Sequence, residues 1–263
     1  MDCTEDTVIC VRGLRNQFGT HVVHENLDLD VRRGEILGVV GGSGTGKSVL
    51  LRSIIGLLPP AAGDITVLGK ELRGLPAKER SQVERRMGVL FQAGALFSSL
   101  TVVENIALPL IEHAGLSRAD AEHIGAMKIG LSGLPASAAQ KYPSELSGGM
   151  IKRAALARSL ALDPDVLFLD EPTAGLDPIG AAEFDQLILT LRAALGLTVF
   201  LVTHDLDTLY TICDRVAVLS DKRVLINDTL KTVEQLDNPW VQAYFQGPRG
   251  RAAAQAQSRR EKQ

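Results

Sequence analysis

Apolar residues in the first 60 positions follow strand-like spacing and then helix-like spacing. Strands are predicted at TVICVRGL (7–14), at the alternating residues Leu27, Leu29 and Val31, and at ILGVV (36–40). The glycine-rich stretch GGSGTGKS (41–48) comes next, and the helically spaced run VLLRSIIGLL (49–58) follows it. The pattern predicts strand, loop and helix in that order.

The remainder of the chain predicts a parallel sheet interrupted by helices. Strands are expected at DITVLG (64–69) and MGVLFQ (87–92), and residues 93–162 are mostly helical in pattern. VLFLDEP (166–172) and TVFLVTH (198–204) flank a helical stretch at 178–195, as in a βαβ unit. VAVLS and RVLIND predict closing strands, and NPWVQAYFQG (238–247) predicts a short final helix. We therefore expect an α/β domain over 7–246 with a helical insertion at about 93–162.

Composition narrows the class of protein. The chain has 263 residues, 45% of them hydrophobic, which is enough for a large core and excludes disorder for most of its length. The net charge of -3 provides no global positive field, so nucleic acid is not an expected partner. Residues 247–263 carry five basic side chains and one acidic one, and predict an exposed, flexible basic tail.

Cysteine content and the chain start indicate a cytoplasmic address. Cys3, Cys10 and Cys213 form no CxxC pair and no even-numbered framework, which argues against disulfides and structural zinc. The start MDCTEDT is acidic, and no apolar run approaches the roughly 18 residues that span a bilayer. If membranes matter, we expect a partner to provide the span.

The glycine-rich stretch has the spacing of a phosphate-binding loop. Gly41, Gly46, Lys47 and Ser48 fit G-x-x-x-x-G-K-[ST] between a predicted strand and a predicted helix, the context that this motif requires. Backbone N–H groups and the helix N-terminus would surround phosphate oxygens. Lys47 would bridge the β- and γ-phosphates, and the Ser48 hydroxyl would bind Mg²⁺. The expected nucleotide-binding residues here are Gly41, Gly42, Ser43, Gly44, Thr45, Gly46, Lys47, Ser48 and Val49.

Two carboxylates follow the apolar strand VLFLD. Asp170 and Glu171 stand at its C-terminal end, where open parallel sheets bind ligands. Asp170 would hold Mg²⁺ and Glu171 would act as the general base on the attacking water. The alternative is that the two carboxylates cap the next helix.

The remaining motifs resemble one family. LSGGMIKRAALARSL places Ser147, Gly148 and Gly149 at a second anion-binding helix start. Together with the P-loop, FLDEP, Gln92 in VLFQ, GLDP (175–178) and LVTHD, it resembles the nucleotide-binding subunits of ABC transporters over residues 7–235. These motifs occur in the order and spacing of that family. The resemblance implies a P-loop NTPase (RecA-like) core with an N-terminal antiparallel β subdomain and an α-helical insertion.

The same resemblance implies a head-to-tail homodimer that holds two ATP molecules at its interface. One subunit would contribute Lys47, Ser48, Asp170, the catalytic residues and Gln92 as a Mg²⁺ ligand. Ser147 and Gly149 of the other subunit would touch the same γ-phosphate, and Asp177 would lie at the dimer seam. The family pattern assigns catalytic roles to Glu171, His204 and Gln92.

The N-terminal region also carries an aromatic residue and two histidines with candidate roles. Phe18 aligns with the family's adenine-stacking aromatic, where tyrosine is more usual, and the alternative is an ordinary core residue. His21 and His24 are three positions apart in a strand and therefore point to opposite faces, which makes them a poor zinc pair.

Several stretches indicate a narrower group and a partner surface. The texts GALFSSLTVVENIALPL, MIKRAALARSLALDP and DPIGAAEFDQLI, with Met150 after SGG, resemble the ATPases of Mla-type, MCE-associated lipid transporters. Leu96 and Phe97 would either receive a coupling helix of the membrane subunit or belong to the core of the helical subdomain.

The resemblance implies a peripheral protein on the cytoplasmic side of the bacterial inner membrane. Its expected partners are integral membrane permease subunits and an MCE-domain lipid-binding protein. The alternative within the family is an ATPase that drives import of another solute. A different class, an ATP-dependent clamp that does not hydrolyse, is disfavoured by Glu171, His204 and Ser147. The basic tail is interpreted as a solvated end of the chain, and the alternative is that it binds anionic lipid headgroups or nucleic acid.

Overall fold

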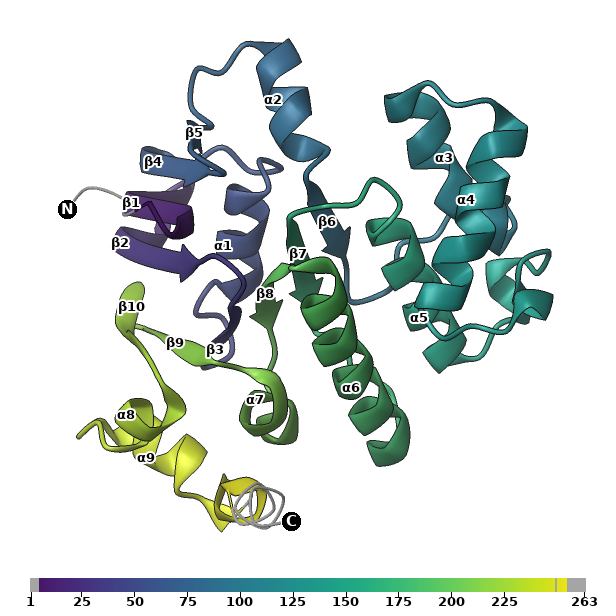
Figure 1. The fold of residues 1–263 in the computed structure, drawn as a ribbon. Helices are drawn as coiled ribbons and strands as arrows, with labels where there is room; N and C mark the ends of the chain where they lie inside the picture. Colours follow the sequence, from purple (N-terminus) through teal and green to yellow (C-terminus); the bar gives the residue numbers. More distant parts are fainter. Residues whose placement is uncertain (1–4, 249, 255–263) are drawn as a thin grey trace. The chain divides into compact units, whose positions relative to one another are not determined.

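The computed structural model describes residues 5–248 and 250–254, and the chain divides into two compact units. The first unit comprises Met1–Arg80 and Phe200–Gln263, and the second comprises Ser81–Val199. The boundaries fall within α2 (Ala77–Glu84) and β8 (Thr198–Val202), and the units are described separately below (Figure 1).

An antiparallel sheet forms one part of the first unit. Its strand order is β2-β1-β4-β5, with β1 at Thr7–Phe18, β2 at His21–Arg32, β4 at Ala62–Val67 and β5 at Lys70–Glu71. β1 and β2 make a hairpin in which Thr7 pairs with Arg32 and Phe18 pairs with His21. The N-terminal antiparallel subdomain is thus confirmed, although the pattern did not predict β5.

The other part of the first unit carries the predicted strand, loop and helix. β3 (Ile36–Gly41) ends at the glycine-rich loop, and α1 (Lys47–Ile54) begins after it. β3 pairs in parallel with β9 (Arg215–Ser220), and β10 (Arg223–Asp228) pairs antiparallel with β9. The unit also contains the helices α7 (Leu206–Ile212), α8 (Leu230–Glu234) and α9 (Pro239–Phe245).

The helices α7 to α9 share a hydrophobic core with β3 and β9. Val40, Leu209, Val233, Val241 and Phe245 are all buried in it. The chain continues helically over residues 250–254, where Ala253 is 4% exposed in the same core. This part of the predicted tail is therefore packed, and the rest of the tail (255–263) lies outside the described residues.

The second unit combines a parallel strand pair with a helical core. β6 (Met87–Leu90) and β7 (Val166–Asp170) are paired in parallel, so that Leu90 lies beside Leu169. The predicted helical stretch contains α3 (Val102–Ala114), α4 (Arg118–Leu131), α5 (Gly148–Ser159) and the short 3-10 turns Ala136–Ala138 and Pro143–Glu145. α6 occupies Pro178–Leu195, the stretch that the pattern predicted.

Polar caps fix the helix starts in the second unit. The Thr101 side chain accepts a hydrogen bond from the Glu104 backbone, and the Glu104 carboxylate accepts one from the Thr101 backbone, forming a capping box for α3. Ser147 caps α5 in a similar way by accepting from Met150 N–H. Met150 itself packs against the helical core, which accounts for an apolar residue after SGG.

The cysteines differ from the expectation. Cys10 in β1 is disulfide-bonded, whereas Cys213 is a free thiol. The sequence argument against disulfides was wrong at this position because an odd number of cysteines excludes complete pairing but leaves room for one bond.

Candidate functional site

Close packing explains why the loop between β3 and α1 needs glycines. A Cβ on Gly41 would lie 2.6 Å from the Leu219 carbonyl oxygen, and one on Gly46 would lie 2.4 Å from Nε2 of His24. Gly46 also has a φ of 93°, in the left-handed region that favours glycine, and it is the N-cap residue of α1. Glycine at these two positions therefore lets the loop backbone pass close to its neighbours and lead directly into the N-terminus of α1, the end of a helix that favours an anion.

Lys47 lies folded over this loop. Its Nζ donates hydrogen bonds to the carbonyl oxygens of Gly41 at 2.8 Å and Gly42 at 3.1 Å. The Gly42 oxygen also accepts a hydrogen bond from the Thr45 hydroxyl at 2.9 Å. A phosphate in the loop would offer the ammonium a charged acceptor in place of these neutral carbonyls, which makes the lysine a suitable phosphate ligand.

The first unit also carries Phe18 and His204. The Phe18 side chain, at the end of β1, is 50% exposed, so it is not a core aromatic. His204 is exposed in the loop after β8, between the buried Thr203 and Asp205, the N-cap residue of α7. The first unit thus holds the whole glycine-rich loop, the predicted stacking residue Phe18 and the predicted catalytic residue His204.

The second unit brings Gln92, Asp170 and Glu171 to one lysine. Gln92 and Glu171 each stand two residues beyond the paired leucines of β6 and β7. Lys152 of α5 is 6% exposed and donates hydrogen bonds to the backbone oxygens of Gln92 at 2.6 Å and Glu171 at 3.0 Å. Burial lowers the pKa of Lys152, and the charges of Glu171 and Asp170 oppose that shift.

Backbone geometry at Glu171 adds to this arrangement. Glu171 has a φ of 49°, an uncommon conformation for a residue with a side chain. Asp170 is 7% exposed at the end of β7. The next helix, α6, takes its cap from Asp177 instead, whose carboxylate accepts from the N–H groups of Ile179 and Gly180. The capping alternative for Asp170 and Glu171 is therefore wrong.

The predicted Ser147 motif and Asp177 lie in one cavity of about 490 Å³. Ser147, Gly148, Gly149 and Asp177 all line it, within the second unit. Arg153 lines the same cavity and forms an ion pair with Glu183 at 3.2 Å. The structure therefore places the N-terminus of α5 and Asp177, the two elements that the resemblance assigns to the dimer interface, beside each other.

Lys152 stands within the stretch LSGGMIKRAALARSL, but the sequence assigned no role to it. A signal for it existed, because it is a single lysine on the face of α5 that otherwise carries buried alanines and a leucine. A buried lysine in such a position requires hydrogen-bond acceptors, but the sequence does not say which carbonyl groups provide them.

Leu96 and Phe97, in the segment after Gln92, lie in different environments. Leu96 packs against the helical core, as the core alternative predicted. Phe97 is 52% exposed, with the Arg158 guanidinium 5.9 Å from the ring centroid. Arg158 also donates to the backbone oxygen of Ala95 at 2.7 Å, so it holds this segment on α5.

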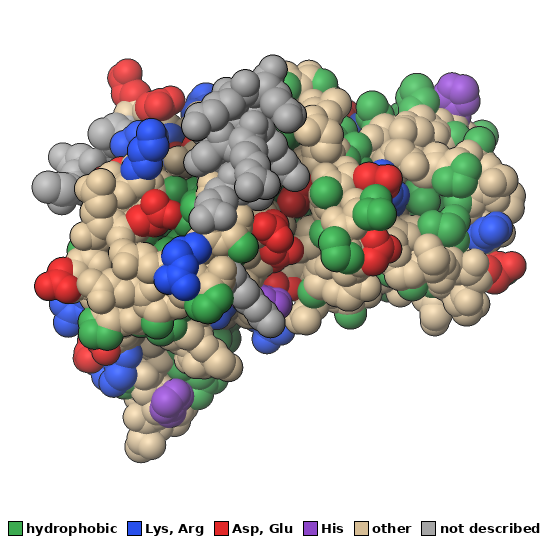
Figure 2. Space-filling view, turned by 90° about the horizontal axis from the view of Figure 1, so that it is seen from below, with side chains coloured by type: hydrophobic (Ala, Val, Ile, Leu, Met, Phe, Trp, Pro, Cys, Tyr) green, Lys and Arg blue, Asp and Glu red, His purple; other side chains and the backbone are tan. Residues whose placement is uncertain are grey.

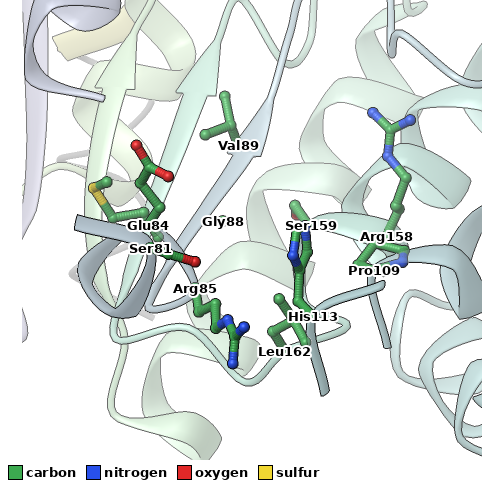
Figure 3. A pocket seen from close by; sticks show the side chains of 11 residues that line it. Ser81, Glu84, Arg85, Gly88, Val89, Pro109, His113, Arg158, Ser159 and Leu162 are labelled. Carbon is green, nitrogen blue, oxygen red and sulfur yellow. The ribbon is translucent and has the colours of Figure 1, made fainter. Parts of the chain in front are cut away.

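Arg158 also lines a second cavity, of about 260 Å³ (Figure 3). Its walls come from residues 81–89, from Pro109 and His113 of α3, and from the C-terminal end of α5. Arg85, His113 and Arg158 provide polar groups along an otherwise mixed lining.

The surface shows charges of both signs. On the face drawn in Figure 2, acidic, basic and hydrophobic side chains are interspersed among the described residues. The described side chains of this face therefore form no continuous basic field. Within the described ranges, no helix is both long and apolar enough to cross a membrane.

Comparisons with known proteins identify relatives. The family model described as ABC transporter matches residues 24–174. The "Probable ribonucleotide transport ATP-binding protein mkl" of Mycobacterium leprae is 39% identical over 91% of this chain and 69% of its own length. The "Intermembrane phospholipid transport system ATP-binding protein MlaF" of Haemophilus influenzae is 40% identical over 91% of this chain and 90% of its own.

A solved structure supports the fold assignment. The dimeric post-hydrolysis state of the ATP-binding cassette MJ0796, bound to ADP and Pi, has a TM-score of 0.77 at 29% sequence identity. It covers 84% of this chain and 98% of that one. The predicted α/β class with a P-loop core is thereby confirmed.

Proposed function

This chain belongs to the ABC transporter family, and we propose that it is the ATP-hydrolysing subunit that powers phospholipid transport across a bacterial envelope through a separate permease. The observation that carries the ATPase part is the phosphate loop, in which Lys47 lies over Gly41 and Gly42 beside the start of α1. The similarity to a phospholipid transport ATPase over 90% of that protein's length supports the cargo.

The residues divide into binding and catalytic roles. The backbone of residues 41–49 and the Lys47 ammonium bind the phosphates, and the exposed Phe18 ring stacks on adenine. Glu171 accepts a proton from the attacking water, and His204 orients that water at the γ-phosphate. Gln92 links the hydrolytic site to the helical segment that follows it.

The donor set of hard oxygens fits Mg²⁺. Ser48, Gln92 and Asp170 offer a hydroxyl, an amide oxygen and a carboxylate, which are the ligand types that this ion prefers. When bound, the ion neutralises charge on the β- and γ-phosphates.

Two subunits complete each site in this proposal. The cavity that holds Ser147, Gly149 and Asp177 would close on the ATP of a second copy, with the N-terminus of α5 directed at the γ-phosphate. The dimeric state of the similar cassette supports this arrangement.

The permease would dock beside the Gln92 segment. The exposed Phe97, the Arg158 that holds it and the 260 Å³ cavity form a continuous surface in the second unit. In this proposal a short helix of the permease binds this surface, and movement of Gln92 would be passed to it. Peripheral attachment to the cytoplasmic face of the inner membrane and an MCE-domain partner belong to the same proposal.

Co-purification tests the transport assignment. The tagged full-length chain is isolated from detergent-solubilised native membranes, and co-eluting proteins are identified by mass spectrometry. A multispan permease with an MCE-domain protein supports phospholipid transport. A permease with a solute-binding protein would replace it with import of another solute, a ribonucleotide being one candidate because the mkl protein carries that name. Absence of any membrane protein, with the tag accessible, would contradict both.

A further inference from the structure

Helix α9 presents two stacked aromatic rings in the first unit. Trp240 and Tyr244 stand one turn apart, with ring centroids 4.7 Å apart and planes 14° from parallel. Both side chains are partly buried. Such a stacked pair behaves as one rigid body, because movement of either ring disturbs the other.

Tyr244 contacts the loop that carries His204. Its hydroxyl donates a hydrogen bond to the backbone oxygen of His204 at 2.9 Å. The His204 side chain is exposed, while its backbone is held from α9. The hydroxyl therefore restricts the orientation of the peptide that follows His204, without contacting the imidazole in that bond.

Trp240 lies beside the phosphate loop. A Cβ added to Gly42 would lie 3.5 Å from Nε1 of Trp240, so the indole edge faces the space that a side chain at position 42 would fill. The Gly42 oxygen is the acceptor for both Thr45 and Lys47. When a triphosphate accepts hydrogen bonds from the Lys47 ammonium, the Gly42 oxygen loses that donor, and its hydrogen bonding changes next to Trp240.

Helix α9 is anchored well enough to transmit such a change. Val241 is 0% and Phe245 is 2% exposed, in the core that contains Val40, the residue before Gly41. The Asn238 side chain accepts hydrogen bonds from Trp240 N–H at 3.0 Å and Val241 N–H at 3.2 Å, which fixes the helix start. Trp240 and Tyr244 are therefore held in a fixed position relative to the phosphate loop and the loop that carries His204.

We propose that Trp240 and Tyr244 are positioning residues that couple occupancy of the phosphate loop to the placement of His204 within one subunit. The proposal rests on the nucleotide site and the His204 role assigned above. Neither aromatic side chain is assigned a contact with ATP, and both act through the backbone of Gly42 and His204. α9 also lies outside the residues that the family model matches.

Two single-atom changes test the Tyr244 link. Tyr244→Phe removes the hydroxyl and keeps the ring stack, so we expect kcat for ATP hydrolysis to fall about 3- to 10-fold while the Kd for ATP stays within twofold. Tyr210→Phe is the matched control, because the Tyr210 hydroxyl donates to Glu234 in the same aromatic cluster and is not bonded to His204. We expect Tyr210→Phe to keep the kcat of the unchanged chain.

Fluorescence tests the Trp240 link, since Trp240 is the only tryptophan in the chain. ATP titrated with Mg²⁺ into the full-length Glu171→Gln variant should produce a saturable change in tryptophan emission. The change should persist when Tyr244→Phe is added, because that substitution leaves the Trp240 contact in place. Adenosine at the same concentrations should produce no such change, because it brings no phosphate to the loop.

The outcomes separate the two proposals. Equal kcat values for Tyr244→Phe and Tyr210→Phe would overturn the coupling, as would ATP binding without any emission change. If the unchanged chain, alone and with its co-purifying partners, neither binds nor hydrolyses ATP, the nucleotide site itself is wrong. Saturable ATP binding and hydrolysis without a change in Trp240 emission would leave the proposed function intact and contradict only the coupling.

Discussion

Lys152 donates a hydrogen bond from Nζ to the backbone oxygen of Glu171 at 3.0 Å. The same ammonium donates to the Gln92 oxygen at 2.6 Å, although Gln92 and Lys152 are 60 positions apart in the sequence. One buried cation thus joins the segments that carry two of the proposed catalytic residues. A charged donor on two carbonyl groups contributes more than a neutral one and keeps both backbones in place.

Lys152→Met should therefore reduce hydrolysis more than binding. The substitution leaves the Gln92 and Glu171 oxygens without this donor, and we expect kcat to fall about 10- to 100-fold with the Kd for ATP within about threefold. Steady-state hydrolysis and equilibrium binding provide the two numbers. Lys128→Met is the control, because Lys128 is equally buried at 6% but pairs with Asp163. A similar loss of kcat in both variants would indicate a general packing defect.

Glu171→Gln tests the general base. The amide cannot accept the proton of the attacking water, so we expect hydrolysis to fall about 10²- to 10⁴-fold while ATP binding is retained. Glu122→Gln, on the surface of α4 where it pairs with Arg118, should hydrolyse ATP at the original rate. Unchanged turnover in Glu171→Gln would remove the assigned role.

Phe18→Ala tests adenine stacking. Loss of a stacking ring costs about 1–3 kcal/mol per base, so the affinity for ATP should fall about 5- to 150-fold. The affinity for inorganic triphosphate should not change, because it has no base. Phe18→Tyr keeps a ring and should restore ATP binding. Equal losses for ATP and triphosphate would mean that the substitution damages the phosphate loop rather than a stacking contact.

Histidine 24 should make stability depend on pH. His24 is 0% exposed, its Nδ1 pairs with the Asn16 side chain at 2.9 Å, and Nε2 makes no hydrogen bond of good geometry within the described residues. Burial lowers the pKa of His24 to about 4 from its usual 6.5, and the backbone of Thr45 offsets part of that shift. The folded state therefore resists protonation more than the unfolded state does.

The sign of the effect follows from that difference. Between about pH 6.5 and pH 4 the unfolded chain binds more protons at this site, so the free energy of unfolding should decrease as the pH falls, by at most about 3 kcal/mol. Above pH 6.5 this contribution should be constant. Urea unfolding from pH 4.5 to 8 should show a smaller slope in His24→Leu than in the unchanged chain. His21→Leu, on the exposed side of the same strand, should retain the slope. Identical slopes in all three proteins would contradict the assignment.

Features that depend on neighbouring residues in the chain could be predicted from the sequence. The loop at 41–48, the strand before it and the helix after it follow from local spacing, and α6 occupies the predicted residues 178–195. These succeed because periodic apolar positions and glycine backbone freedom act within a few residues. The family resemblance added the candidate roles of His204, Ser147 and Gln92, which spacing alone does not assign.

Only the tertiary structure decided which distant groups satisfy one another. The Lys152 ammonium, the Tyr244 hydroxyl and the His24 ring all required partners or exclusion from water, but their positions in the sequence do not name those partners. The pairing of Tyr244 with His204 spans 40 residues and depends on how α9 packs on the core. A buried polar group must be satisfied by whatever the fold brings to it, and that choice is made by packing over the whole unit.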